Sequence, residues 1–374
     1  MPSASTVRDA ERAALALSRV SGVGPVTFRT LVDALGSADA VFRAPVSVLR
    51  RVDGCPRHVA DAVRAFDQWG EVDAELRRLG ALGGRLLTLS GAEYPLHLRR
   101  IHDPPSVLYA LGDWPTAERR VVAVVGSRRA TPYGTATATR LAQELARAGF
   151  VVVSGLARGI DAAAHQGALA AGGRTVAVLG CGVDVTYPPE MRELKDRVQS
   201  HGSVLSELPL GAPPDPHHFP TRNRIISGMA LGVLVIEAAA DSGSLITAKL
   251  ALEQGREVFA VPGNVGTRTS TGTNRLIKAG ATLVETADDL IEQLVGQIGT
   301  AAQRRSSAPT ITVDLTADER RVFDLLSWEP AHVDELTVRS SVAPDRLAEL
   351  LLGLELKGVA KQVPGHRYVR QVTL

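Results

Sequence analysis

VVAVVGSRRATPYG, residues 121–134, contains the pattern that decides the fold. Its first six residues form a continuous apolar run, which is typical of a strand covered on both faces. A serine and two arginines come next. The segment GTATATRLAQELARAG then has apolar residues three and four apart, which predicts a helix. The stretch therefore reads as strand, polar loop and helix.

The same unit recurs along the chain. Further apolar runs are FVVVSG (150–155), TVAVLG (175–180), VLVIEA (233–238) and EVFAVPG (257–263). Helical patterns such as DAAAHQGALAAGG and SLITAKLALEQG separate them. Alternating strands and helices predict an α/β fold with a doubly wound, mostly parallel sheet, which RLLTLS and SVLYALG extend.

Different patterns flank this central region. Residues 1–81 read as a small all-α domain of the helix-hairpin-helix or SAM-like kind, with glycine turns at Gly22–Pro25 and Gly54–Pro56. Such turns serve either DNA contact or packing and protein contact. The α/β domain is expected over 82–296 and a linker over 297–313. Residues 314–374 have the order of a winged-helix-like domain, which binds either DNA or protein.

Composition limits the class of protein. The 374 residues are 45% hydrophobic with a formal net charge of +2, which is typical of a soluble globular chain. Binding to a polyanion must therefore come from local placement of arginines. Two cysteines fit a reducing compartment, and no apolar run approaches signal-peptide or membrane length. We expect a cytoplasmic protein that does not enter a membrane.

Glycines and cations follow the predicted strands. Because ligands bind at the carboxyl ends of strands in such sheets, these residues should share one rim and bind phosphate groups. A helix predicted to begin near Thr221, with that threonine as N-cap, would place two arginines at its positive end. The candidate residues are Gly126, Ser127, Arg128, Gly155, Arg158, Gly159, Phe219, Arg222, Asn223, Arg224, Ser242, Gly243, Asn274 and Lys278.

Cofactor and metal signatures are missing from the sequence. GSRRAT does not match G-x-G-x-x-G, and no Walker motif occurs. His217 and His218 have no carboxylate or cysteine at metal spacing. Asp161 reads as a first-turn helix residue and His165 as a packed or hydrogen-bonded side chain. We therefore expect no cofactor, no metal and no catalytic residue.

Six segments between about residues 85 and 295 resemble the DNA-processing protein A family (DprA, also called Smf) of bacteria. They are VVAVVGSRRATPYG, VVSGLARGIDAAAHQGAL, AVLGCGVDVTYPPE, HFPTRNRIISGMA, VIEAAADSGSLITAKLALEQGREVFAVPGN and GTNRLIKAGA. The resemblance implies an extended Rossmann-like domain that forms a homodimer and binds single-stranded DNA without hydrolysing it. It also implies help in loading the RecA recombinase during natural transformation.

The resemblance also assigns residues. The family's pocket carries over to residues 126–128, to Arg158 and Gly159, and to Phe219 and residues 222–224, with Phe219 placed to stack on a base. One departure is Thr221, because many relatives have a basic residue there.

Two alternatives remain open. Arg224 could pair with Glu237 or Asp241 instead of binding an anion. The chain could also be a nucleoside-monophosphate phosphoribohydrolase of the lysine decarboxylase-like type, since Pro262–Thr267 echoes the P-G-G-x-G-T loop of those enzymes. The glutamate that closely follows their loop is replaced here by Arg268-Thr269-Ser270.

Overall fold

A single nine-stranded sheet forms the centre of the part of the chain that the computed structural model describes, namely residues 4–114, 120–295, 315–326, 331–340, 342–357, 359–363 and 366–370. Its strands are β1 (Arg85–Thr88), β2 (Val107–Gly112), β3 (Val121–Val125), β4 (Val151–Ser154), β5 (Thr175–Val178), β6 (Ser203–Ser206), β7 (Gly232–Val235), β8 (Glu257–Ala260) and β9 (Thr282–Leu283). Their order is β1-β2-β6-β5-β4-β3-β7-β8-β9. Only the β1–β2 and β2–β6 pairs are antiparallel. The predicted doubly wound, mostly parallel sheet is thus confirmed.

Strand β6 was not predicted. Its four residues, SVLS, include two serines, and nothing in so short and polar a run indicates a strand. All four side chains are nevertheless buried. The Ser206 hydroxyl donates to the carbonyl of Cys181 at 2.7 Å, which meets its hydrogen-bonding need inside the fold.

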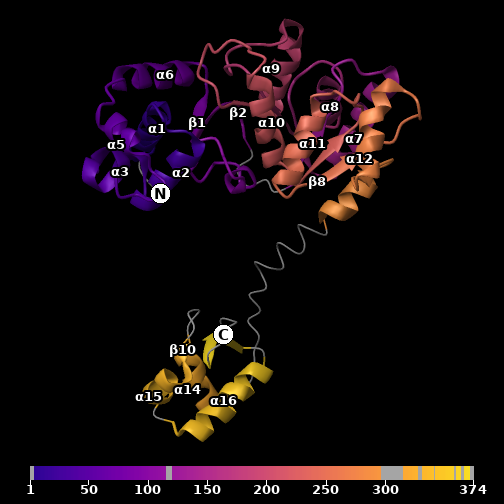
Figure 1. The fold of residues 1–374 in the computed structure, drawn as a ribbon. Helices are drawn as coiled ribbons and strands as arrows, with labels where there is room; N and C mark the ends of the chain where they lie inside the picture. The colour runs from indigo at the N-terminus through magenta and orange to yellow at the C-terminus, as the bar shows by residue number, and fades with distance from the viewer. Residues whose placement is uncertain are drawn as a thin grey trace. The chain divides into compact units, whose positions relative to one another are not determined.

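Helices cover both faces of the sheet (Figure 1). Alternate side chains of β3 point to opposite sides: Val122 packs in one hydrophobic cluster and Val121 in another. The first cluster includes residues of α7 (Pro132–Arg147) and α8 (Ile160–Ala170). The second includes residues of α10 (His218–Met229) and α11 (Ser244–Glu253). Further helices of this region are α9 (Arg192–His201) and α12 (Thr271–Lys278), and residues 287–295 are also helical.

The direction in which successive strands are added to the sheet reverses between β3 and β7. From β3 the chain runs outward through β4, β5 and β6, then returns to place β7 on the other side of β3. The two strands pair in parallel, with Val125 opposite Val235 at their carboxyl ends. Such a topological switch point opens a crevice between the loops that leave the two strands.

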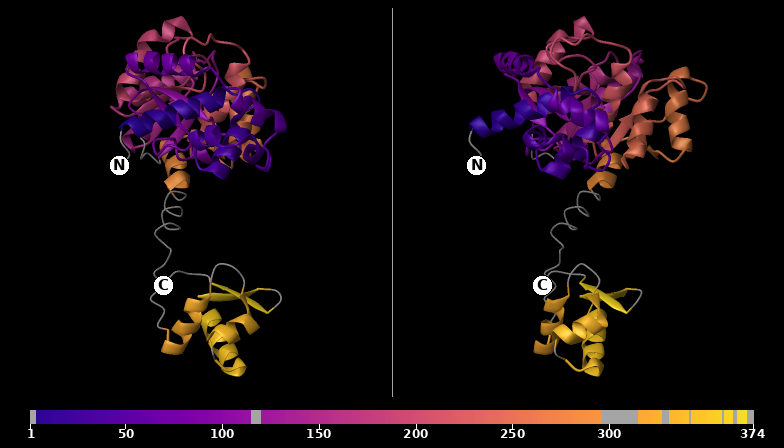
Figure 2. Two further views of the ribbon diagram at one scale, coloured as in Figure 1. Left: turned by 90° about the vertical axis from the view of Figure 1, so that its left-hand side faces the viewer. Right: turned by 60° about the vertical axis from the view of Figure 1, so that its left-hand side comes forward.

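Six helices precede the sheet, as predicted for an all-α region: α1 (Ala4–Arg19), α2 (Pro25–Leu35), α3 (Ala38–Arg43), α4 (Val46–Leu49), α5 (Arg57–Arg64) and α6 (Trp69–Ala81). They gather at the β1 edge of the sheet (Figures 1 and 2). Gly22 and Gly54, in the two predicted turns, have φ of 82° and 77°, a region that favours glycine. Arg29 reaches across to the carbonyls of Ile101 and His102, at 3.0 and 2.7 Å.

The chain divides into two units, Met1–Leu294 and Val295–Leu374. In the second, α14 (Ala317–Leu325), β10 (Ala331–His332), α15 (Val333–Ser340), α16 (Pro344–Leu356), β11 (Ala360–Val363) and β12 (Arg367–Arg370) have the predicted winged-helix order. Strands β10, β12 and β11 form an antiparallel sheet. The predicted linker lies outside the described residues, and the boundaries at 81/82, 296/297 and 313/314 stay predictions. None of the helices described is long and apolar enough to span a membrane.

The N-terminal helices and the sheet share one hydrophobic cluster, which includes the fully buried Leu31 of α2 and Leu108 of β2. We expect Leu31→Ala and Leu108→Ala each to lower the free energy of unfolding by about 2–5 kcal/mol. Both should shift the same calorimetric unfolding transition to a lower temperature. Leu351→Ala, in the separate cluster of the second unit, is the control and should leave that transition in place. A separate unfolding transition of the N-terminal helices that Leu108→Ala leaves unchanged would contradict the shared core.

Candidate functional site

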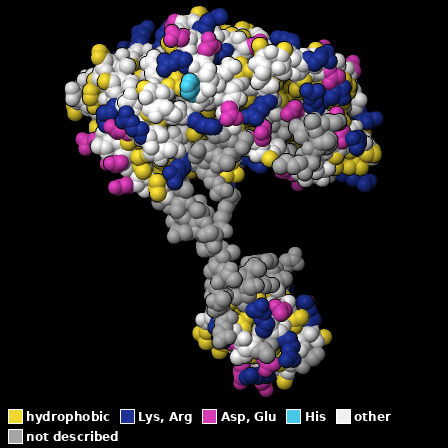
Figure 3. Space-filling model, turned by 180° about the vertical axis from the view of Figure 1, so that it is seen from behind, with side chains coloured by type: hydrophobic (Ala, Val, Ile, Leu, Met, Phe, Trp, Pro, Cys, Tyr) yellow, Lys and Arg dark blue, Asp and Glu magenta, His cyan; other side chains and the backbone are white. Residues whose placement is uncertain are grey.

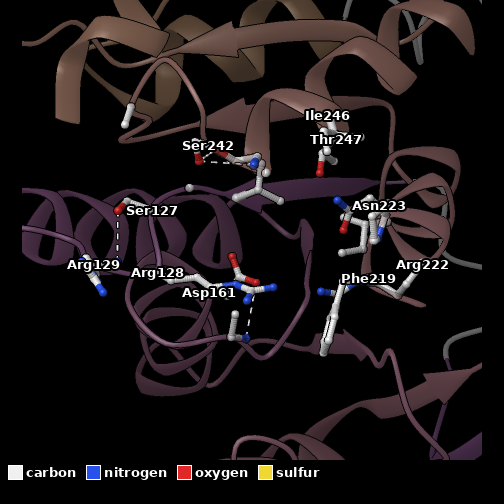
Figure 4. Close-up of a pocket in the computed structure, with 18 of the residues that line it drawn as sticks. Ser127, Arg128, Arg129, Asp161, Phe219, Arg222, Asn223, Ser242, Ile246 and Thr247 are labelled. Carbon is white, nitrogen blue, oxygen red and sulfur yellow. Dashed lines mark hydrogen bonds between the residues drawn. The ribbon is translucent and has the colours of Figure 1, made fainter. Parts of the chain in front are cut away.

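A cavity of about 560 Å³ opens at the switch point (Figure 4). We call it the switch-point pocket. The loop after β3, the first half of α10 and the turn that begins α11 form most of its wall, and Asp161 of α8 and Tyr187 complete it. Its lining includes Gly126, Ser127, Arg128, Arg129, Asp161, Tyr187, Phe219, Arg222, Asn223, Ser242, Gly243, Ile246 and Thr247.

The ring of Phe219 is the centre of one wall. The guanidinium carbons of Arg128 and Arg222 lie 5.1 and 5.9 Å from its centroid, and the Tyr187 ring lies 5.7 Å away at 41°. Gly180 makes room for the ring, since a Cβ there would lie 2.9 Å from a Phe219 ring carbon. The pocket thus combines aromatic surface with two positive charges.

Arg222 forms the floor of the pocket and is only 5% exposed. Its Nη1 donates to the carbonyl of Gly155 at 2.8 Å and also to that of Val178, at the ends of β4 and β5. A Cβ on Gly155 would lie 2.3 Å from that nitrogen, so the glycine leaves space for the guanidinium. Burial lowers the pKa of Arg222 to about 10, against the opposing effect of Asp161. Arg222 therefore stays charged at neutral pH.

Asp161 lies in the first turn of α8, as predicted, and is buried beside this arginine. Burial raises its pKa, although Arg222 and the N–H groups of Ala157 and Gly155 favour the carboxylate. The N–H of Gly155 donates to its Oδ2 at 3.2 Å. This carboxylate is thus the partner of a buried cation.

His165 lies one turn further along α8 and is fully buried. Its Nδ1 lies 2.7 Å from the hydroxyl of Thr175, so the expectation of a hydrogen-bonded side chain is confirmed. Burial, with a further contribution from Arg222, lowers the pKa of His165 to about 3. The imidazole is therefore neutral over the physiological range.

Eight of the candidate residues line the switch-point pocket: Gly126, Ser127, Arg128, Phe219, Arg222, Asn223, Ser242 and Gly243. Gly155 and Gly159 lie behind its wall. With φ of 75°, Gly159 lets its backbone approach Ser127, because a Cβ would meet the Ser127 carbonyl at 2.3 Å. Arg158 is exposed outside the lining and forms an ion pair with Glu190.

Helix α10 begins at His218 and not near Thr221, so that prediction was wrong. Proline is tolerated in a first helical turn because the N–H groups there have no partner within the helix, and Pro220 is the third residue of α10. The Thr221 hydroxyl donates to the carbonyl of His217 at 3.2 Å instead of capping the helix. Both arginines therefore lie past the first turn, where the helix dipole does not oppose them.

Arg224 lies outside the pocket lining and is 7% exposed. Its Nη2 donates to Glu207 at 2.6 and 2.5 Å, and its Nε lies 3.4 Å from Asp103. The geometry thus favours the ion-pair alternative, with partners other than those expected. Glu237 instead accepts the N–H of Thr131, the N-cap of α7, at 2.9 Å.

Asn274 and Lys278 line a different cavity, beside the loop Pro262–Thr267. The Asn274 amide both donates to the carbonyl of Gly263, at 2.8 Å, and accepts its N–H, at 3.1 Å. Asn274 therefore holds that loop in place. No acidic side chain lines this cavity among the described residues.

Sequence reasoning did not select several lining residues, among them Arg129, Tyr187, Ile246 and Thr247. Arg129 directly follows Arg128, so the doubled arginine was a usable signal. Ile246 and Thr247 lie in the first turn of α11, and their periodicity indicates only a helix. Tyr187-Pro188-Pro189 reads from the sequence as a rigid turn near the pocket, but nothing there shows that the tyrosine ring lies beside Phe219.

Comparison with known proteins identifies relatives across the chain. Residues 85–295 match the family model described as DNA recombination-mediator protein A. Residues 8–65 match a DprA-like N-terminal HHH domain, and residues 306–366 match a DprA winged helix domain. Protein Smf of Synechocystis is 33% identical to this chain, over 96% of this chain and 98% of its own length.

Two solved structures are also similar. DNA processing protein A of Streptococcus pneumoniae has a TM-score of 0.64 and 33% identity, covering 75% of this chain and 97% of its own. The Helicobacter pylori protein has a TM-score of 0.52 and 31% identity, covering 57% of this chain and 97% of its own. Its structure is described as giving insight into a single-stranded DNA binding mode.

The close contact between Gly155 and Arg222 generates a stability prediction. We expect Gly155→Ala to lower the free energy of unfolding by about 1–3 kcal/mol, because the added methyl group displaces a buried guanidinium. Gly243→Ala is the matched control: no atom lies within 4 Å of its added Cβ, and the change should stay within about 1 kcal/mol. Urea denaturation measures both. Equal effects of the two substitutions would mean that the guanidinium is not fixed there.

Proposed function

The chain belongs to the DNA recombination-mediator protein A family, and on this basis we propose that it binds single-stranded DNA in the switch-point pocket without catalysing a reaction. The observation that carries the proposal is the placement of Arg128 and Arg222 around Phe219. Aromatic rings for bases and cations for the backbone are the two requirements for binding single strands.

Free positive charge at the pocket comes from Arg128 and Arg129. Both are exposed, and neither has an ion-pair partner in the described parts of the chain. Arg222 adds a buried charge that raises the electrostatic potential of the pocket, with its Nη1 already bonded to two backbone carbonyls. Asp161 is the one carboxylate among the lining residues. The balance favours an anion, and a phosphate backbone supplies one at each nucleotide.

Phe219 favours a single strand over a duplex, because only unpaired bases can turn a face towards a protein ring. Arg128 now covers that ring. A cation–π contact at an exposed site contributes about 0.5–1 kcal/mol, whereas base–aromatic stacking contributes about 1–3 kcal/mol. A base can therefore displace the guanidinium, which is then free to bind a phosphate.

The absence of catalysis is part of the proposal. Asp161 is buried beside Arg222, and His165 has a pKa too low for a general base at neutral pH. The phosphoribohydrolase alternative needs an acid near the loop Pro262–Thr267, and no acidic residue lines that cavity in the described structure. Incubation with nucleoside monophosphates tests this alternative directly, because release of free base would support a phosphoribohydrolase.

Family membership also supports finer proposals. We propose that the protein acts in the cytoplasm as a homodimer, and that it helps to load RecA recombinase on the strand it protects, in transformation or recombination. Light scattering measures the dimer. The rate of RecA filament formation on DNA, with and without this protein, measures the loading.

Arg128→Ala should weaken binding of an oligonucleotide and make its salt dependence shallower. The slope of log K against log salt should fall by about 0.7, the value for one phosphate contact on a single strand. Arg147→Ala is the control, since this exposed arginine lies in the last turn of α7, at the end remote from the pocket. Fluorescence anisotropy at several salt concentrations gives both slopes. Identical slopes for the two variants would refute the phosphate contact.

Glu190→Gln should strengthen binding, because it frees Arg158 from its exposed ion pair. The salt slope should steepen by about 0.7 if Arg158 then takes a phosphate. Glu193→Gln removes the same charge from nearby α9, where no ion pair is found for Glu193 among the described residues. The same titrations apply. A gain shared by both variants would reflect net charge alone.

A further inference from the structure

Tyr187 lines the switch-point pocket beside Phe219 but has no part in the function proposed so far. We propose that Tyr187 is a second base-stacking residue, so that the pocket holds two neighbouring bases and prefers strands whose bases separate easily. This inference rests on the proposed binding of single-stranded DNA and specifies how the same site does it.

The exposure of the ring is the first reason. Tyr187 is 41% exposed, whereas Phe219 is partly buried and lies under Arg128. The Tyr187 hydroxyl makes no hydrogen bond within the described residues, so no polar contact explains the ring's position. An incoming base therefore reaches Tyr187 without displacing any side chain.

Hydrogen bonds hold the loop that carries Tyr187 in place. Lys195 of α9 is 5% exposed, and its Nζ donates to the carbonyls of Val183 and Val185 at 2.6 and 3.1 Å. Asp184, between them, accepts the N–H of Gly211 at 2.8 Å. A ring on a fixed loop loses little conformational entropy when a base stacks on it. The buried lysine is thus a positioning residue for this face of the pocket.

The spacing of the two rings sets the preference. Their centroids lie 5.7 Å apart and their planes are tilted by 41°. Stacked bases lie about 3.4 Å apart along a strand, so two bases that occupy both rings cannot remain stacked on each other. The strand has to break that base stack on binding. Thymine runs, which stack weakly, should therefore bind better than adenine runs, which stack strongly.

A cation borders the pair of rings on the side of Phe219. The guanidinium carbon of Arg128 lies 5.1 Å from the Phe219 centroid, and Arg128 is exposed. A phosphate beside the base on Phe219 would thus have a guanidinium within reach.

The test measures the affinity of the full-length protein for a fluorescent oligothymidylate and an oligoadenylate of equal length, about eight nucleotides. Tyr187→Ala and Tyr187→Leu should weaken oligothymidylate binding by about 5- to 150-fold, the range for one lost base stack, with an unchanged salt slope. Tyr187→Phe keeps the ring and should restore binding. The preference for thymine over adenine should shrink in both variants without the ring.

Controls separate this inference from the function on which it depends. Tyr133→Ala removes a tyrosine that is 62% exposed and outside the pocket lining, and should bind as the wild type does. If Tyr187→Leu binds like the wild type while Phe219→Ala is weak, the second stacking site is refuted and the pocket stands. If the wild type binds no single strand, both proposals fall. A changed salt slope in Tyr187→Leu would mean a lost phosphate contact and would also overturn the stacking role.

Discussion

The buried guanidinium of Arg222 is the interaction on which the site depends. Moving a charge out of water costs several kcal/mol unless partners replace the lost hydration. Here two strand-end carbonyls accept hydrogen bonds from Nη1 and the charge of Asp161 favours the cation, whereas Nε has no hydrogen-bond partner among the described residues. The bonds fix α10 over the ends of β4 and β5, and Phe219, three residues earlier on the same helix face, is thereby fixed at the pocket wall. Positions 155 and 180 are glycines because the side chains of Arg222 and Phe219 occupy the space that a larger residue there would need.

Most arginines near the rim are engaged by the protein itself. Arg224 pairs with Glu207, Arg158 with Glu190, and Arg222 with the backbone. On the face seen in Figure 3, basic and acidic side chains of residues 4–295 are interspersed. With a net charge of +2 the chain has little long-range attraction for a polyanion. Because few arginines at the rim are free, affinity for a strand must depend more on base stacking than it would if all of these arginines were free.

The sequence predicts the sheet well, because strands buried on both faces require continuous apolar runs that polar loops interrupt. It also predicts the loops of the pocket, since strand ends carry the ligand sites in such folds. It does not predict which arginine is free. Arg224 is bound by Asp103, 121 residues away, and Arg222 by Gly155, 67 residues away. Such partners are brought together only by tertiary packing, as are Tyr187 and Phe219.

Arg128 shows how a preformed pocket can release what it binds. The guanidinium of Arg128 lies over the partly buried ring of Phe219, so part of the ring surface is already in contact with a cation. A base that enters would gain the difference between stacking and the cation–π contact, which is at most about 2.5 kcal/mol. When the base leaves, Arg128 returns and recovers that contact. In the proposed binding mode the pocket therefore exchanges one contact for another, which keeps the net gain from each stacked base small.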